Sequence, residues 1–218
     1  MLSAENLTLS YGRTVALANA SATVRRGEVV AFVGPSGSGK STMLYCMAGL
    51  LRPDSGRVVL DGVDLTRLDD GARSDLRRRE FGFVFQFAEL VPELSLWENI
   101  ELPLELNGVG RRERRARVRE LLHELGIEEQ ADRRPAKVSG GQAQRAAVAR
   151  AMAHRPRVIF ADEPTGALDS QNSGVVLDAL ITLASLNDTA VVLVTHDPQV
   201  ADRAHRTVHM HDGSAGLE

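Results

Sequence analysis

Cysteine, lysine and long apolar segments are scarce in this chain of 218 residues. The single cysteine, Cys46, excludes an internal disulfide and any cysteine-based metal cluster. No apolar stretch reaches the ~18 residues that a membrane-spanning helix requires, and the first residues lack the basic and apolar regions of a signal peptide. We therefore expect a soluble, cytoplasmic protein in which Cys46 is a small core residue.

The chain also lacks an excess of positive charge, since its formal net charge is -3. Proteins that bind nucleic acid through backbone phosphates usually carry a marked basic excess, so we expect no nucleic acid partner. The hydrophobic fraction of 43% is sufficient for a full core. The length fits one domain spanning residues 1–218, or one domain with a sizeable subdomain.

A complete G-x-x-x-x-G-K-[ST] pattern follows the apolar run at residues 29–33. Glycines allow backbone N–H groups to wrap a polyphosphate, and the helix predicted over residues 41–48 would point its N-terminus at the phosphates. Lys40 is predicted to reach the β- and γ-phosphates, and the Ser41 hydroxyl to bind Mg²⁺. A chance turn rich in glycine and serine is the weaker alternative. The predicted phosphate loop consists of Gly34, Pro35, Ser36, Gly37, Ser38, Gly39, Lys40, Ser41 and Thr42.

Lysine usage supports this interpretation, because only Lys40 and Lys137 are lysines among the 26 basic residues. A compact ammonium therefore stands in the phosphate loop of a chain that otherwise uses arginine, whose planar guanidinium has a different geometry.

Three short apolar runs rich in β-branched residues predict parallel strands that are buried on both faces. Each run is followed by polar residues: the phosphate loop, Asp162-Glu163, and Thr195-His196-Asp197. Ligands of doubly wound sheets bind beyond the carboxyl ends of the strands, so we expect the three clusters to converge on one site. The runs cover residues 29–33, 158–161 and 191–194.

The remaining segments predict other elements. Residues 7–10 alternate in polarity and residues 57–62 end in a turn, which indicates an antiparallel sheet. Residues 87–137 have a helical pattern, with Gly126 as a stop signal after apolar residues at helical spacing. We expect residues 212–216 to be frayed.

The segment VSGGQ at residues 138–142 precedes an alanine-rich helical pattern. Here the chain resembles the ATP-binding cassette (ABC) ATPases, whose signature is LSGGQ, with Val138 in place of leucine. Alone, this segment suits a helix-capping turn equally well. About twenty residues later, however, a strand ends in Asp162 and Glu163, and the resemblance extends from Tyr11 to about Asp197.

The resemblance implies an α/β fold of the P-loop NTPase type. Its mostly parallel core sheet and N-terminal antiparallel β subdomain would be formed by residues 1–86 and 146–218. An inserted α-helical subdomain that carries the signature would cover about residues 87–145.

The resemblance also implies an ATPase with ATP and Mg²⁺ as cofactors. Glu163 matches the catalytic glutamate, His196 the switch histidine that contacts the γ-phosphate, and Gln86 the residue that senses Mg²⁺ and the attacking water. Lys40 completes the catalytic set, and the implied metal ligands are Ser41, Gln86 and Asp162, the last acting through the water shell. A solvated loop is the ordinary alternative for the paired carboxylates.

Nucleotide contacts are implied on two cassettes that pair head to tail. Tyr11 would stack on adenine, although an ordinary surface tyrosine is the alternative. The D-loop residue Asp169 would cross to the other protomer. The signature residues that would contact the partner's ATP are Ser139, Gly140, Gly141 and Gln142. Because one chain carries every motif, a homodimer would have two competent sites.

Residues 163–170 are similar to the lipoprotein-releasing and macrolide-exporting branch of bacterial ABC ATPases. This similarity implies export or mechanotransmission through an integral membrane permease, with the cassette peripheral on the inner face of the membrane. Residues 87–100 look like the family's permease-contacting segment. Four of their apolar side chains could line a groove or simply form subdomain core: Leu90, Val91, Leu94 and Trp97.

Alternatives from other classes are a soluble cassette acting on a cell division complex, ribosome or DNA, and a small-molecule kinase that would leave the signature unused. The arginine-rich residues 111–119 suit a solvated helix face better than contact with lipid head groups. The five histidines other than His196 are expected to be solvated.

Overall fold

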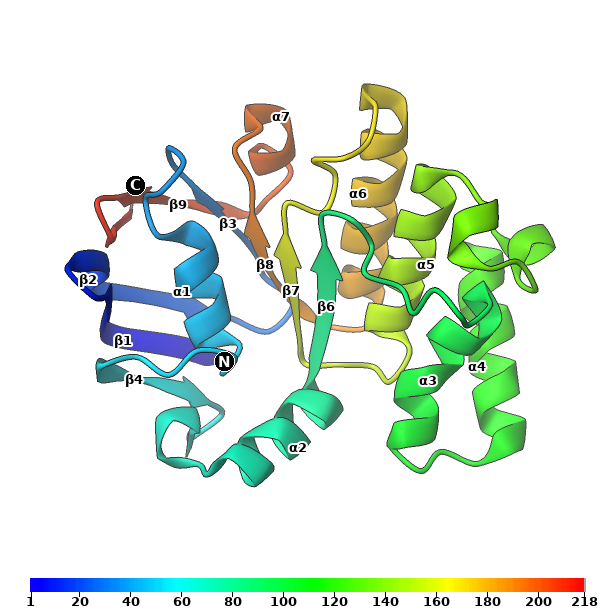
Figure 1. Ribbon diagram of the computed structural model, residues 1–218, viewed down its shortest axis with the longest axis horizontal. Coiled ribbons are helices and arrows are strands. Elements are labelled where there is room, and N and C mark those ends of the chain that lie inside the picture. The colour runs from blue at the N-terminus through cyan, green and yellow to red at the C-terminus, as the bar shows by residue number, and fades with distance from the viewer. Residues whose placement is uncertain (218) are drawn as a thin grey trace. The chain divides into compact units, whose positions relative to one another are not determined.

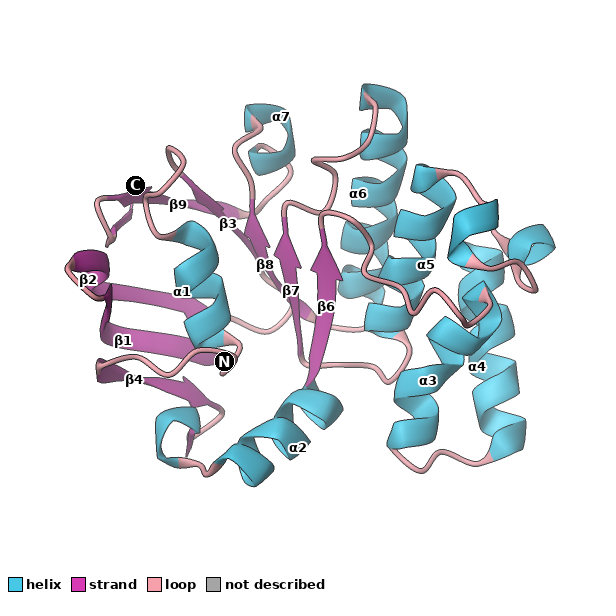
Figure 2. Ribbon diagram, viewed as in Figure 1, coloured by secondary structure: helices cyan, strands magenta, loops and turns pink. Residues whose placement is uncertain are grey.

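The computed structural model describes residues 1–217 and consists of two compact units. The first unit combines Met1–Arg77 with Ala190–Glu218, and the second is Arg78–Thr189. Most strands belong to the first unit, whereas helices dominate the second (Figures 1 and 2). The chain therefore leaves the first unit once and returns to it with its last three strands.

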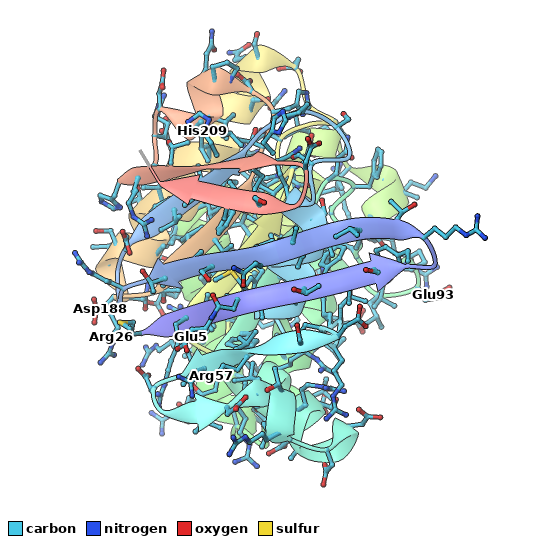
Figure 3. All side chains as sticks on the ribbon, turned by 90° about the vertical axis from the view of Figure 1, so that its left-hand side faces the viewer. Glu5, Arg26, Arg57, Glu93, Asp188 and His209 are labelled. Atoms are coloured by element: carbon cyan, nitrogen blue, oxygen red, sulfur yellow. The ribbon has the colours of Figure 1, made fainter. Side chains whose placement is uncertain are left out.

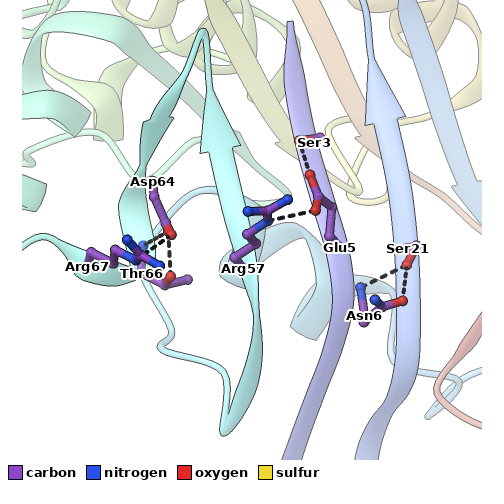
Figure 4. A network of polar contacts seen from close by, with 8 residues as sticks. All are labelled: Ser3, Glu5, Asn6, Ser21, Arg57, Asp64, Thr66 and Arg67. Carbon is purple, nitrogen blue, oxygen red and sulfur yellow. Dashed lines mark hydrogen bonds and ion pairs between the residues drawn. The ribbon is translucent and has the colours of Figure 1, made fainter.

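A four-stranded antiparallel sheet in the order β2-β1-β4-β5 confirms the antiparallel prediction for the N-terminal region. One face carries fully buried side chains such as Leu7 and Leu17. The other carries polar pairs across the strands, including Arg57 Nε donating to Glu5 Oε2 at 2.7 Å (Figures 3 and 4). The strands are β1 (Leu2–Tyr11), β2 (Thr14–Val24), β4 (Ser55–Leu60) and β5 (Val63–Asp64).

The other strands of the first unit are mainly parallel, as their β-branched sequences predict. β3 (Val29–Val33) pairs in parallel with β8 (Ala190–Val194) and β9 (Arg206–His211). The helices of this unit are α1 (Lys40–Met47) and α7 (Pro198–Ala201), with a 3-10 turn at Leu65–Arg67, and α2 (Asp70–Glu80) leads into the second unit. Cys46 is buried on α1, and burial raises the pKa of its thiol to about 12.

The prediction of a frayed segment at residues 212–216 is wrong. β10 (Ser214–Leu217) pairs antiparallel with β9, with Ser214 opposite His211. Asp212 and Gly213 both have positive φ, which is the conformation that a two-residue hairpin turn requires. The Gly213 amide also donates to the Ser38 carbonyl at 3.1 Å, so the hairpin supports the phosphate loop.

The second unit contains two parallel strands and four long helices. β6 (Phe81–Phe85) pairs with β7 (Val158–Asp162) from end to end. Buried Val118, Leu121 and Leu122 confirm the predicted helical spacing. The helices are α3 (Leu96–Leu106), α4 (Arg111–Glu124), α5 (Gly140–Met152) and α6 (Ser170–Leu186), with 3-10 turns at Glu128–Gln130 and Pro135–Lys137.

In the second unit, the exposure of His154 and of the arginine-rich segment differs from the prediction. His154 is half-buried rather than solvated, and its Nε2 lies 3.0 Å from the Phe81 carbonyl. On α4, Arg114 pairs with Glu101 at 3.0 Å and Arg117 is buried, so only part of the arginine-rich segment is a solvated face. Across residues 1–217, no helix combines the length and apolar character needed to cross a bilayer.

Candidate functional site

The phosphate loop connects β3 to α1 in the first unit and is built around Lys40. This side chain is only 7% exposed, and its Nζ donates to the carbonyls of Gly34 and Pro35, each at 2.8 Å. The ammonium is therefore folded back across the loop that precedes it. A long, flexible stem that ends in a compact charge is what this position requires.

Two glycines of this loop adopt backbone conformations that other residues disfavour. Gly34 has a φ of 148°, and a Cβ added there would lie 2.2 Å from the Met210 carbonyl oxygen. Gly39 has a φ of 99°, and its added Cβ would lie 2.4 Å from the Ala16 carbonyl oxygen. The loop thus passes closely over its surroundings, so neither position has room for a side chain.

The N-terminus of α1 is suited to an anion. Gly39 is its N-cap and supplies no side-chain hydrogen bond, and the first turn contains no acidic residue. Among the described residues, Ser38 Oγ is buried without a hydrogen-bond partner. An uncapped helix N-terminus, a buried ammonium and an orphaned hydroxyl together fit a bound phosphate chain.

His196 leaves the strand next to the phosphate loop. Phe32 of β3 is opposite Val194 of β8. The first residue of the phosphate loop, Gly34, lies two residues after Phe32, and His196 lies two residues after Val194. The following amide of Asp197 donates to Thr195 Oγ1 at 3.0 Å, which fixes the turn that carries His196. The structure therefore places His196 and the phosphate loop at neighbouring carboxyl ends of parallel strands in the first unit.

Tyr11 lies at the end of β1, next to the hairpin turn toward β2. Its side chain is 55% exposed, which is a large exposed area for an aromatic residue. An exposed ring at a strand end is available for stacking on a base.

In the second unit, Gln86 and Glu163 follow neighbouring strand ends. Phe85 of β6 is opposite Asp162 of β7, so each of the two residues directly follows a paired position. A Cβ added at Gly166 would lie 3.1 Å from both Gln86 Nε2 and Glu163 Oε2. The structure therefore brings these two side chains together beside Gly166. Glu163 has a φ of 48°, a conformation that is strained for a residue with a side chain.

The signature residues form the N-terminus of α5, and this end is capped from within. Ser139 Oγ accepts from the Gln142 amide at 3.2 Å, and Gln142 Oε1 accepts from the Ser139 amide at 2.9 Å. These reciprocal bonds form a capping box. The capping turn that the sequence left open as an alternative is therefore present, and contact of the same residues with nucleotide stays a prediction.

The same end of α5 lies beside the start of α6. Asp169 caps α6 by accepting from the Asn172 amide at 2.9 Å, and this bond lowers the pKa of the Asp169 carboxyl. A Cβ added at Gly141 would lie 2.6 Å from Asn172 Oδ1. Asn172 therefore connects the D-loop residue to the signature, although no sequence motif indicated it.

The predicted magnesium ligands have suitable chemistry. Ser41, Gln86 and Asp162 offer hydroxyl, amide and carboxylate oxygens, which are the hard ligands that Mg²⁺ prefers. The described residues contain no cluster of three or more histidine, cysteine or acidic side chains that could hold a metal. The predicted set includes only one acidic residue, so it would not itself form such a cluster.

Sequence reasoning also missed Gln144 and Arg150 on α5. Gln144 is 2% exposed and donates to the Phe85 carbonyl at 2.7 Å, and Arg150 donates to the carbonyls of Ala88 and Glu89. One signal was present: Gln144 shares a helical stripe with Ala147, Val148 and Ala151, and a polar residue on an apolar stripe implies a buried hydrogen bond.

Comparison with known proteins gives consistent results. The family described as ABC transporter matches residues 17–166. The uncharacterized ABC transporter ATP-binding protein YvrO of Bacillus subtilis (strain 168) is 42% identical over 222 residues, which cover 100% of this chain and 96% of that protein. The lipoprotein-releasing system ATP-binding protein LolD 2 of Caulobacter vibrioides is 45% identical over 192 residues, which cover 88% of this chain and 84% of that protein.

Solved structures show the same similarity. The ATP-binding cassette MJ0796, described as a dimer in a post-hydrolysis state bound to ADP and Pi, has a TM-score of 0.90 and 40% identity, covering 99% of this chain and 96% of that one. CbiO1 from Clostridium perfringens, part of the ABC transporter complex cbiONQ, has a TM-score of 0.89 and 29% identity, covering 99% and 86%.

Proposed function

Because this chain belongs to the ABC transporter family of ATP-binding proteins and hydrolyses ATP to ADP and phosphate, we propose that it drives an export or mechanotransmission permease as a homodimer. The convergence of Gln86 and Glu163 beside Gly166 carries the chemical part of the proposal. The identity of 45% to a lipoprotein-releasing ATP-binding protein supports the choice of branch. We also propose that residues of about 87–145 act as the helical subdomain.

Residues of the first unit would hold the nucleotide. The phosphates would lie against the loop amides and the uncapped N-terminus of α1, with Lys40 turning from the Gly34 and Pro35 carbonyls toward the β- and γ-phosphates. Tyr11 would stack on adenine, and His196 would donate to the γ-phosphate. Phosphoryl transfer needs positioning and charge neutralisation more than covalent chemistry, and these residues supply both.

Residues of the second unit would act on the attacking water. Glu163 would accept a hydrogen bond from that water and polarise it, and Gln86, which lies next to it, would help to orient it. Asp162, Gln86 and Ser41 would hold Mg²⁺, which neutralises phosphate charge when it is bound. The strained backbone of Glu163 is consistent with a role in catalysis, because such strain persists where function requires a fixed side-chain direction.

Two copies would enclose two ATP molecules. MJ0796 is described as dimeric with ADP and Pi bound, and its cassette aligns with 99% of this chain. Ser139, Gly140, Gly141 and Gln142 would face the partner's ATP, and Asp169 would reach the partner through the D-loop. Since the capping box leaves the Gly140 and Gly141 amides outside its two reciprocal bonds, those amides are suited to an anionic ligand.

The permease would contact the segment that follows Gln86. Phe87 is 72% exposed, whereas Leu90, Val91, Leu94 and Trp97 are half-buried. The half-buried side chains would line the contact surface, and the exposed Phe87 ring would insert into the permease, since aromatic side chains are enriched at binding surfaces. A peripheral position on the inner face of the membrane would follow from this contact.

Glu163→Gln tests the chemistry. We expect retained ATP binding, a fall in kcat of about 100-fold or more, and an ATP-dependent dimer, because the amide cannot act as a base. Glu129→Gln, at an exposed position outside these motifs, is the matched control and keeps the wild-type rate. Wild-type turnover in Glu163→Gln would reject the assignment.

Affinity capture from detergent-solubilised membranes tests the partner. Tagged Glu163→Gln in ATP is expected to retain an integral membrane protein in stoichiometric amount, and the Phe87→Ala/Glu163→Gln protein to lose it. Phe87→Ala alone should hydrolyse ATP normally. Leu186→Ala, which removes another apolar side chain of similar exposure, should retain the membrane protein in the Glu163→Gln background. Recovery of ribosomal proteins or nucleic acid instead would overturn the permease assignment and leave the ATPase chemistry in place.

A further inference from the structure

The backbone on both sides of Gln86 is held by the helix that begins with the signature. Gln144 of α5 donates its Nε2 to the carbonyl of Phe85, the residue before Gln86, at 2.7 Å. Arg150, near the other end of α5, donates to the carbonyls of Ala88 and Glu89 at 3.0 and 2.6 Å. Two polar side chains of one helix therefore bracket the glutamine.

The contact between α5 and β6 is close enough to transmit a displacement. A Cβ added at Gly82 of β6 would lie 2.3 Å from the Ala151 carbonyl oxygen, so strand and helix backbones pack without an intervening side chain. Close-packed elements of this kind move together rather than deform. Gln144 is 2% exposed, so loss of its partner would leave a buried polar group unsatisfied.

The loop that Arg150 holds has an unfavourable backbone. Ala88 and Glu89 have φ values of 63° and 49°, and two consecutive residues with side chains in the left-handed region need support from their surroundings. Their carbonyls point to one guanidinium, and bonds to a charged donor are stronger than neutral ones. Arg150 is thus the side chain that stabilises this turn.

We propose that Gln144 and Arg150 are positioning residues that couple the signature end of α5 to Gln86. This inference rests on the proposed function of the signature and of Gln86. When the partner's nucleotide engages Ser139, Gly140 and Gly141, a shift of α5 along its axis carries the Phe85 and Ala88 carbonyls with it. The Gln86 side chain, and with it the orientation of the water beside Glu163, then depends on whether the dimer is closed.

Arg150→Gln is the first test. We expect kcat to fall about tenfold, because the two charge-assisted hydrogen bonds that hold the loop are lost, while the KM for ATP changes less than twofold. Arg150→Lys, which keeps one charged donor, should recover part of the lost rate. Arg155→Gln, at an exposed position just beyond α5, removes the same charge and should leave both constants unchanged.

A double-mutant cycle with Gln86→Ala separates positioning from general damage. If Arg150 acts through Gln86, the Gln86→Ala/Arg150→Gln protein has the kcat of Gln86→Ala alone. Multiplicative losses in the double variant would overturn the proposal, as would equal losses in Arg150→Gln and Arg155→Gln. The same cycle with Gln144→Leu should give the same non-additivity.

Hydrogen exchange keeps the test independent of the ATPase assignment. The amides of residues 86–91 should lose protection in Arg150→Gln while those of β7 and α6 remain protected. Uniform loss of protection across the second unit would mean that Arg150 is only structural. If Gln86→Ala kept the wild-type kcat, the proposed function of Gln86 would fail, yet the local change in exchange would still show whether Arg150 holds this loop.

Discussion

The phosphate loop and the signature turn both contain glycine and lead into helices, and they differ in how the helix N-terminus is capped. At α1, the N-cap is left-handed Gly39 and no side chain caps the helix. At α5, Ser139 and Gln142 cap each other's amides in a reciprocal box. The first end is left open for a ligand, whereas the second is stable within the isolated chain.

The two turns differ in which groups bond to their backbone amides and carbonyls. The phosphate loop is closed by its own lysine and packed against surrounding backbone carbonyls, so contacts within the first unit fix its backbone. In the signature turn, the Ser139 and Gln142 amides are already bonded within the capping box. A ligand would add contacts to the glycine amides. An anion would therefore satisfy helix amides that no side chain caps at the first turn, whereas at the second it would add to a cap that is already formed.

The largest expected effect comes from the lysine of the first turn. Lys40→Ala leaves two loop carbonyls without their donor and removes the charge that is proposed to turn toward the phosphates, so we expect ATP affinity to fall about 100-fold or more. Lys40→Arg should be nearly as poor, because a planar guanidinium does not reproduce the geometry of the buried, compact ammonium. Binding of a fluorescent ATP analogue measures both.

Lys137, the other lysine, is the control because it is exposed two residues before the second turn. Lys137→Ala should change affinity less than about threefold, as for an ordinary surface charge. Equal losses in the two alanine variants would contradict the view that only the first turn depends on a buried ammonium.

The phosphate loop could be predicted from the sequence, whereas the long-range polar contacts of side chains in the second unit could not. The phosphate loop is a contiguous pattern, so residues 34–42 and both flanking elements could be identified from local chemistry. The contacts of Asn172, Gln144 and Arg150 join segments separated by up to 62 positions, and only the packing of α5 against β6 and α6 brings them together. Single-sequence patterns carry no information on such pairings.

Local chemistry would also have corrected one wrong prediction. Asp212-Gly213 is a typical hairpin dipeptide, and it follows the alternating residues of β9. Nearness to the last residues of the sequence favours fraying, whereas hydrogen bonds to β9 and to Ser38 order the segment. Hydrogen bonding of the backbone is therefore a better guide than position in the chain.

The next largest expected effect is on stability, and it should differ between alanine substitutions at one glycine of each turn. Gly39→Ala combines a left-handed backbone with a Cβ 2.4 Å from a carbonyl oxygen, so we expect a loss of about 3 kcal/mol in the free energy of unfolding. At Gly140 the nearest atom to an added Cβ is Leu168 Cδ2 at 3.6 Å, so Gly140→Ala should stay within about 0.5 kcal/mol of wild type. Urea unfolding compares the two.

Activity should separate the same pair of variants in another way. Gly140→Ala is expected to fold normally but to lose ATP-dependent dimer formation, since its methyl group would lie where the partner's nucleotide is proposed to bind. A stable Gly39→Ala protein with wild-type unfolding would show that the first turn is not constrained as its backbone indicates.

The smallest effect concerns the cap of the second turn. Ser139→Ala removes the side-chain half of the capping box, which costs about 1 kcal/mol and lowers the Tm by about 2–4 °C for a protein of this size. Ser95 at the start of α3 forms the same kind of box with Glu98 and provides a matched control. Ser95→Ala should lower the Tm equally and leave the ATPase rate unchanged, whereas Ser139→Ala should lower both. If the two variants lost the same stability and neither lost activity, Ser139 would be a helix cap alone, and the second turn would have no role in binding the partner's ATP.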